Sequence, residues 1–411
     1  MSIYYTDEGV TLHHGNALAL PLADNTVDLV VTSPPYFGLR SYRDDGEHYV
    51  GQIGAEATPA EFVDALLTAT VEMVRVLKSS GSIWVNLGDK YAQNTERSRN
   101  GNGNRASIDG FQGGKPLRGP TVSLGRKDNA GTRTKSLFGI PWRYALRCID
   151  DLGLILRAEV IWSKPNGLPE SVTDRVRRSH EQWFHFTKEP RYYSAVDAIR
   201  ETYAPGTKAR YAAGYVANTR AKTGNHDNGF HRSVSDGDTG PAAVNALGKL
   251  PGSVWSIATQ PLKVPAELGI DHFAAFPMEW PRRLINGWSP PGVCTACGEG
   301  RRPVSERDPN CAASHRQASC ACPDTTAPTT PATVLDPFGG TGTTALVARV
   351  LGRHGVSVDL SEDYCRLAKW RTTDAGQIAR AMRVAKPAKQ VRGQPTLFDM
   401  DRGRSAEEPH A

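Results

Sequence analysis

Short apolar runs alternate along this chain with segments in which apolar residues recur at helical spacing. Runs rich in β-branched and aromatic residues predict buried strands, whereas apolar positions three or four residues apart predict helices. This alternation indicates an α/β fold built on an open sheet. The predicted strands are residues 10–14, 27–33, 82–87, 154–162, 180–187, 334–336 and 354–359, and the predicted helices are residues 58–77, 137–150, 278–288 and 361–385.

One predicted strand ends in a rigid polar loop. Pro34 and Pro35 can donate no ladder hydrogen bond, so the strand ends by Ser33. Ligands bind beyond the carboxyl ends of strands in open α/β sheets, which places this loop where chemistry is expected. The hydroxyl of Ser33 and the carbonyl of Pro34 could accept the hydrogens of an exocyclic amine, and Tyr36 offers a flat face for base stacking. From these residues alone, a proline-rich turn after a core strand is an equal alternative.

A second polar loop follows the strand at 334–336 and is rich in glycine. Glycines let a cofactor approach the backbone, and Asp359, about 20 residues further on, suits ribose hydroxyls. The glycines alone would equally suit a dinucleotide enzyme. Asp336 and Phe338 open this loop, however, and a negative charge there disfavours a pyrophosphate and suits a cationic cofactor such as S-adenosylmethionine. The loop reads Asp336-Pro337-Phe338-Gly339-Gly340-Thr341-Gly342-Thr343-Thr344.

Together, Thr32-Ser33-Pro34-Pro35-Tyr36 and residues 336–344 resemble the two signatures of the DNA amino-methyltransferases of bacteria and phages, which modify N4 of cytosine or N6 of adenine. Their order, with the catalytic loop first, resembles the circularly permuted beta group, and the resemblance covers most of residues 10–370. It implies a Rossmann-like, seven-stranded, S-adenosylmethionine-dependent fold that acts on double-stranded DNA. Ser-Pro-Pro-Tyr resembles the cytosine-N4 version, whereas Asp-Pro-Pro-Tyr is commoner in adenine enzymes, so adenine N6 is the alternative.

The resemblance also implies roles for individual residues. Asn16 matches a position whose side chain reaches the cofactor's adenine, although an asparagine that stabilises a turn is as good an interpretation. Phe276 and Pro277 match a segment at the methionine end of the cofactor, and could equally be plain core. The loop at 162–166 matches one that borders the base pocket. The predicted catalytic residues are Ser33, Pro34, Pro35 and Tyr36, and the predicted cofactor-binding residues are Asn16, Phe276, Pro277, Asp336, Phe338, Gly339, Gly340, Thr341, Gly342, Thr343 and Asp359.

Two irregular regions carry basic charge. Residues 91–136 are rich in Asn, Gly and Arg, and we predict a mobile loop that orders on DNA phosphates; a solvated insertion is the alternative. Residues 190–265 interleave basic residues with tyrosines and are the candidate target-recognition region.

The remaining divisions of the chain are a catalytic half (1–90), a continuation of the sheet (137–189), a cofactor-pocket segment (266–290), a zinc-binding insertion (291–330), a cofactor-binding half (331–386) and a disordered tail (387–411).

Five of the seven cysteines lie between Gly292 and Pro323. A Cys-x-x-Cys-Gly turn and a second close pair suit a tetrahedral zinc ion, and a disulfide set is disfavoured in a reducing cytoplasm. Because four thiolates leave no open coordination position, the metal would be structural. The predicted ligands are Cys294, Cys297, Cys320 and Cys322, with Cys311 or His315 as substitutes.

The whole chain adds few constraints. A net charge of +6 is modest, so DNA binding depends on where the basic residues cluster. No apolar run approaches the roughly 18 residues of a membrane span, and the chain starts without a basic and apolar leader, which predicts a cytoplasmic protein. The family resemblance implies that the protein is encoded by a bacterium or phage and associates with the nucleoid. In the tail, Gln394 to Phe398 resembles peptides that bind the bacterial replication clamp, although a chance match is the stronger interpretation.

Two other classes of protein are alternatives. An RNA or protein-amide methyltransferase could share the cofactor fold, but such enzymes are not expected to place the catalytic loop first. A non-catalytic, zinc-containing DNA-binding protein is the more remote alternative, and for it a Ser33→Ala change would alter nothing.

Overall fold

The structure is a computed structural model that describes residues 2–38, 43–44, 47–48, 52–92, 132–206, 247–270, 275–301, 320, 322 and 327–385. Several predictions concern residues outside these ranges. They are most of the basic loop (93–131), the middle of the target-recognition region (207–246), Cys311 and His315 as substitute zinc ligands, and the clamp-like peptide from Gln394 to Phe398.

A nine-stranded sheet forms the centre of the described part of the chain, in the order β1-β2-β14-β13-β3-β6-β8-β7-β9. Strands β2, β14, β13, β3 and β6 run parallel to one another, and β8 is antiparallel to both β6 and β7. The bounds are β1 Ser2–Thr6, β2 Val10–His14, β3 Val27–Thr32, β6 Leu77–Leu87, β7 Ile155–Ser163, β8 His180–Thr187, β9 Val254–Ser256, β13 Thr333–Asp336 and β14 His354–Asp359.

The sheet has two strands more than the seven that were expected. The run from β2 to β7 has seven strands, and β1 and β9 add one at each edge. β1 folds back on β2 as an antiparallel hairpin, and the three-residue β9 pairs with β7. Both additions cover backbone groups that an edge strand would otherwise leave unpaired.

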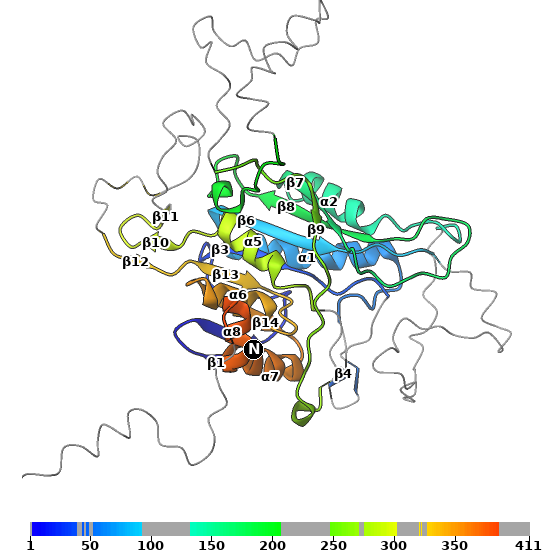
Figure 1. Cartoon of the computed structure of the whole chain (residues 1–411). Helices are drawn as coiled ribbons and strands as arrows, with labels where there is room; N and C mark the ends of the chain where they lie inside the picture. The colour runs from blue at the N-terminus through cyan, green and yellow to red at the C-terminus, as the bar shows by residue number, and fades with distance from the viewer. Residues whose placement is uncertain are drawn as a thin grey trace, which may run out of the picture.

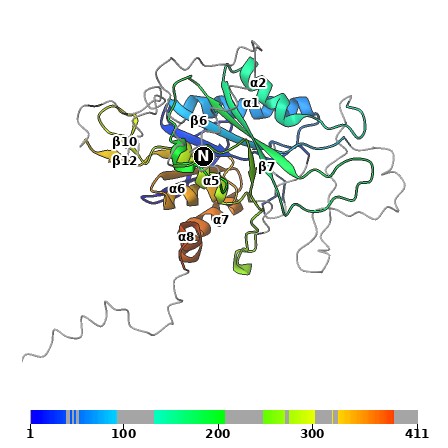
Figure 2. The ribbon, with the colours of Figure 1, turned by 45° about the horizontal axis from the view of Figure 1, so that its top comes forward.

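Helices cover both faces of the sheet (Figures 1 and 2). Helices α1 (Pro59–Val76) and α2 (Ile140–Asp150) lie on one face, where Val30 and Ile83 belong to the same buried cluster. Helices α5 (Glu279–Trp288), α6 (Thr343–Val350) and α8 (Ala375–Met382) share the opposite cluster with Val31 and Trp84. Because successive strand residues point to opposite faces, one apolar strand supplies both cores.

Helix α1 begins as the sequence predicts. Thr58 and Glu61 form a reciprocal capping box, with Pro59 at the first helical position. The helix ends at Val76, one residue before the predicted end, and the strand predicted at residues 82–87 begins earlier, because residues 77–81 also belong to β6. Leu77 already has extended backbone angles, so the strand follows the helix without a connecting loop.

The predicted single helix at 361–385 is two helices. α7 (Glu362–Thr373) and α8 meet at Asp374, which has an extended backbone. The carboxylate of Asp374 accepts a hydrogen bond from the backbone N–H of Gln377, 2.8 Å away, and so caps the second helix. Helical periodicity alone did not reveal this break.

The smaller elements lie outside the main sheet. A three-stranded antiparallel sheet contains β10 (Gly292–Cys294), β11 (Gly300–Arg301) and β12 (Thr329–Thr330), and a two-stranded one contains β4 (Arg43–Asp44) and β5 (Glu47–His48). Two short 3₁₀ helices span Val196–Ile199 and Ala266–Leu268. Within the described ranges, no helix combines the length and hydropathy that a membrane crossing requires.

Candidate active site

A cavity of about 460 Å³ lies where β3, β13 and β14 end, and both predicted loops line it. The two loops are about three hundred residues apart in the chain, yet their strands pair side by side. The parallel sheet therefore brings their carboxyl ends to one edge. The predicted residues that line the cavity are Ser33, Pro34, Pro35, Tyr36, Asn16, Phe276, Phe338, Gly339, Gly340, Thr341, Thr343 and Asp359.

Asp336 does not line this cavity, contrary to the expectation that it faces a cationic cofactor. Its carboxylate is 1% exposed and accepts hydrogen bonds from the hydroxyls of Thr32 (2.7 Å) and Thr344 (2.9 Å), and from the backbone N–H of Phe338 (3.2 Å). Burial raises the pKa of Asp336 to about 6. Asp336 thus ties the catalytic strand to the glycine-rich loop from beneath.

Two more predicted residues lie behind the cavity wall. Gly342 has a φ of +71° as it caps α6, and a Cβ there would lie 2.8 Å from the Cβ of Ala368. Pro277 is buried just ahead of α5. Both residues shape the wall without reaching its surface.

The glycine-rich loop packs tightly on β14. A Cβ at Gly339 would lie 1.7 Å from the hydroxyl oxygen of Ser357 and 3.0 Å from its Cβ, so any larger residue would require Ser357 to move. The carboxylate of Asp359 accepts hydrogen bonds from the backbone N–H groups of Gly340 (2.7 Å) and Ser361 (2.9 Å). Asp359 therefore fixes the loop and still borders the cavity.

Asn86, at the end of β6, organises the catalytic loop. Its side-chain oxygen accepts from Ser33 Oγ (3.2 Å) and lies 2.8 Å from the hydroxyl of Tyr36, while its Nδ2 donates to the carbonyl of Gln182 (3.1 Å). The bond to Gln182 sets the orientation of the amide. Because the hydroxyl hydrogen of Ser33 points to Asn86, a ligand that approaches the serine oxygen must be a donor.

Glu181 and Lys164 border the cavity beside Tyr36. A carboxylate oxygen of Glu181 lies 2.8 Å from the Tyr36 hydroxyl, and its other oxygen pairs with the ammonium of Lys164. The ammonium lies 4.2 Å from the ring centroid of Trp162, within cation–π range. The charges of Lys164 and Glu181 therefore neutralise each other within this part of the cavity wall.

A family model described as DNA methylase, covering N6 and N4 methyltransferases, matches residues 27–370. The chain belongs to this DNA methylase family. Type II methyltransferase M.XycI of Xanthomonas campestris pv. cyanopsidis is 32% identical to it over 383 residues, 92% of this chain and 91% of that protein. Type II methyltransferase M.Cfr9I of Citrobacter freundii is 30% identical over 380 residues, with the same shares covered.

A solved structure agrees on the fold. The PvuII DNA methyltransferase, titled cytosine-N4-specific, aligns with 93% of this methylase and 94% of its own chain, with a TM-score of 0.51 and 17% identity. The expected α/β methyltransferase fold is thereby confirmed.

A buried arginine in this DNA methylase escaped the sequence analysis. Arg371 is 3% exposed, and its Nη1 donates to the hydroxyls of Thr341 (2.5 Å) and Thr343 (2.7 Å), both in the cavity wall. Burial lowers its pKa to about 10, so it stays charged at neutral pH. No carboxylate of the described residues pairs with it. An arginine in an amphipathic helix normally indicates an exposed position, so its sequence offered no signal.

Asn86 and Glu181 of the methylase were also missed as site residues. Each lies at the cavity-side end of its strand, because β6 ends there and the antiparallel β8 begins there. Once the strand pairing is known, a polar residue at this end of a strand indicates a site residue. Asn16 lines the cavity while its Oδ1 accepts from the backbone N–H of Leu18, 3.0 Å away, so it also stabilises a turn. Residues 259–262 also line the cavity.

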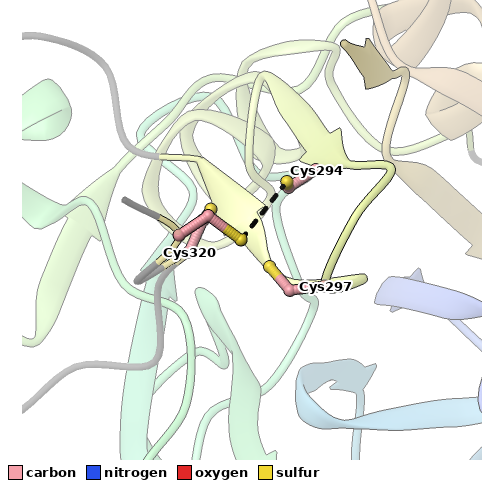
Figure 3. Close-up of side chains that lie close together, drawn as sticks. Cys294, Cys297 and Cys320 are labelled. Carbon is pink, nitrogen blue, oxygen red and sulfur yellow. Dashed lines mark hydrogen bonds between the residues drawn. The ribbon is translucent and has the colours of Figure 1, made fainter. Parts of the chain in front are cut away.

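The four predicted zinc ligands of the methylase lie together, away from the cavity. The sulfurs of Cys294, Cys297, Cys320 and Cys322 are all within 4.8 Å of one another. Figure 3 shows the first three, contributed by β10, the turn after it and the segment beyond β11.

Proposed function

We propose that this methylase transfers a methyl group from S-adenosylmethionine to the exocyclic amine of a base flipped out of double-stranded DNA, with N4 of cytosine as the acceptor. The observation that carries the proposal is the convergence of residues 33–36, residues 338–341 and Thr343 on one cavity. A flipped base and a cofactor must meet in such a space for direct transfer.

The cavity wall fits the proposed cofactor. S-adenosylmethionine supplies a methyl group activated by the positive sulfonium. Gly339 and Gly340 would allow close approach to the backbone, Asp359 would accept ribose hydroxyls, and Phe276 would contact the methionine end. Asp336 would act from below the wall by holding the glycine-rich loop against β3.

The catalytic loop would orient the amine. Ser33 Oγ and the Pro34 carbonyl would each accept a hydrogen bond from one N–H of the amine, so that the lone pair of the amine faces the methyl group. Asn86 would keep Ser33 in the acceptor orientation, and Tyr36 would stack on the base while Asn86 and Glu181 hold its hydroxyl. As the new N–C bond forms, the S–C bond breaks, and the amine releases its extra proton to water.

The choice of cytosine over adenine depends on Ser33, because adenine enzymes of the family more often carry aspartate at the matching position. Mass spectrometry of nucleosides from exposed plasmid DNA tests it. We expect N4-methylcytosine; N6-methyladenine would instead support the alternative acceptor. Methylation of RNA or protein with unmodified DNA would refute the assignment to DNA bases.

We propose a circularly permuted fold, because the catalytic strand β3 precedes the cofactor strand β13 in the chain and pairs with it in parallel. We propose that the regions 91–136 and 190–265 contact DNA, in a cytoplasmic protein. A zinc ion on four cysteines would have no part in methyl transfer.

Arg371 leads to a prediction about cofactor binding. Its charge, relayed by the hydroxyls of Thr341 and Thr343, should favour the cofactor's carboxylate. Arg371→Met should weaken binding of S-adenosylhomocysteine about tenfold. Binding of 5′-methylthioadenosine, which lacks the carboxylate, should change by less than about twofold. Calorimetry with both ligands measures the difference.

The exposed Arg366 on the same helix is a matched control, since it pairs with Asp363. Arg366→Met should leave both affinities unchanged. Equal weakening of both ligands by Arg371→Met would show that the arginine only supports the wall and does not act on the carboxylate.

A further inference from the structure

We propose that Cys294, Cys297, Cys320 and Cys322 bind one Zn²⁺ ion in a closed tetrahedral site. Tetrahedral zinc with Zn–S bonds of about 2.3 Å requires sulfurs about 3.8 Å apart. Here all four sulfurs lie within 4.8 Å of one another, and those of Cys294 and Cys322 are 4.0 Å apart. Figure 3 shows the side chains of Cys294, Cys297 and Cys320 gathered close together.

Backbone hydrogen bonds position both pairs of cysteines, the first arm being Cys294 with Cys297 and the second arm Cys320 with Cys322. After Cys294, the chain reverses in a turn closed by the N–H of Gly298, which donates to the carbonyl of Cys294 (2.9 Å), and Gly298 has a φ of +75°. This turn carries Cys297 back toward Cys294. The N–H of Cys320 donates to the carbonyl of Gly300 (3.0 Å), which aligns the second arm with β11.

The geometry favours a metal over disulfides. A disulfide needs sulfurs about 2.05 Å apart, whereas all six cysteines in the described ranges are free thiols. Four sulfurs that are mutually close suit one central ion, while two disulfides would form two separate short pairs. The guanidinium of Arg301 lies 3.8 Å from the sulfur of Cys294, where it offsets the negative charge of a zinc tetrathiolate.

The strands around the four cysteines bury too little apolar surface to form a stable sheet unaided. β10 has three residues, β11 and β12 have two each, and among their apolar side chains only Val293 and Cys294 are buried. Such a sheet needs an additional cross-link to be stable, and a bound metal ion supplies one. β12 ends two residues before β13 begins, at the end of β13 opposite the cavity. The ion would thus fix the entry to the cofactor strand without touching the reaction.

Metal analysis of the full-length, reduced protein tests the site. Inductively coupled plasma mass spectrometry after gel filtration should find one zinc ion per chain in the wild-type protein. The Cys320→Ser and Cys322→Ser variants should each lose this ion. Cys148→Ala is the control, because Cys148 is buried in α2 outside the cluster and should leave the zinc content unchanged. If the serine variants do not fold, mercurial titration of the wild-type protein should release one zinc as four thiols react.

Three results would overturn the proposal. The first is folded, reduced protein without zinc whose cluster thiols all react freely. The second is cysteine pairs found as disulfides by mass spectrometry under non-reducing conditions. The third is full zinc retention in both serine variants, which would exclude these residues as ligands. Cobalt exchange adds a positive readout, because a tetrahedral thiolate site should give the intense visible absorption of Co²⁺ bound by sulfur.

Discussion

Replacing Ser33 with alanine should slow methyl transfer about 10²- to 10³-fold, because the amine loses an oriented acceptor in the transition state. Cofactor affinity should stay within about twofold, since Ser33 acts on the base and not on the cofactor. Single-turnover transfer of labelled methyl groups to DNA, together with calorimetry for S-adenosylhomocysteine, measures the two quantities separately.

Two variants refine this prediction. Ser82 is a buried serine on β6 that bonds to His185 and does not line the cavity, so Ser82→Ala should keep the wild-type rate. Tyr36→Phe keeps the stacking ring and loses only the hydroxyl near Asn86 and Glu181, so its loss should be smaller than that of Ser33→Ala. A wild-type rate in Ser33→Ala would remove the serine from the mechanism and favour a non-catalytic DNA-binding protein.

Replacing Asp336 with alanine should lower the free energy of unfolding by about 3 kcal/mol, because the hydroxyls of Thr32 and Thr344 and the N–H of Phe338 lose a buried acceptor. Cofactor affinity should fall as well, since the glycine-rich loop loses its tie to β3. Denaturant titration and calorimetry measure the two effects. An unchanged cofactor affinity would show that the loop keeps its position without this tie.

Asp336→Asn separates charge from shape. Burial raises the pKa of Asp336 from 3.8 to about 6, so the folded protein keeps a proton that the unfolded chain releases. The stability that this proton contributes is present below pH 3.8 and is lost as the pH rises through 6. From about pH 4 to pH 7, the wild type should therefore lose about 2 kcal/mol relative to Asp336→Asn. Parallel stability curves for the two proteins would contradict the raised pKa.

The sequence by itself determined the local elements of the site. Pro34 and Pro35 had to end a strand, because neither can donate a ladder hydrogen bond. The two motifs were sufficient to identify the DNA methylase family, which the family comparison confirmed. The cysteine spacing likewise predicted a cluster that the structure brings together. In each case the information lies in a few consecutive residues, whose conformations are set by covalent geometry and short-range sterics.

Only the tertiary structure decided which way single polar side chains point. Asp336 looked like a cofactor ligand and is buried beneath the loop, whereas Arg371 looked exposed and lies behind the cavity wall. Asn86 and Glu181 join the site because β6 and the antiparallel β8 present their ends to the same edge of the sheet. These positions depend on contacts between strands and helices far apart in the chain, and no local pattern of residue types encodes them.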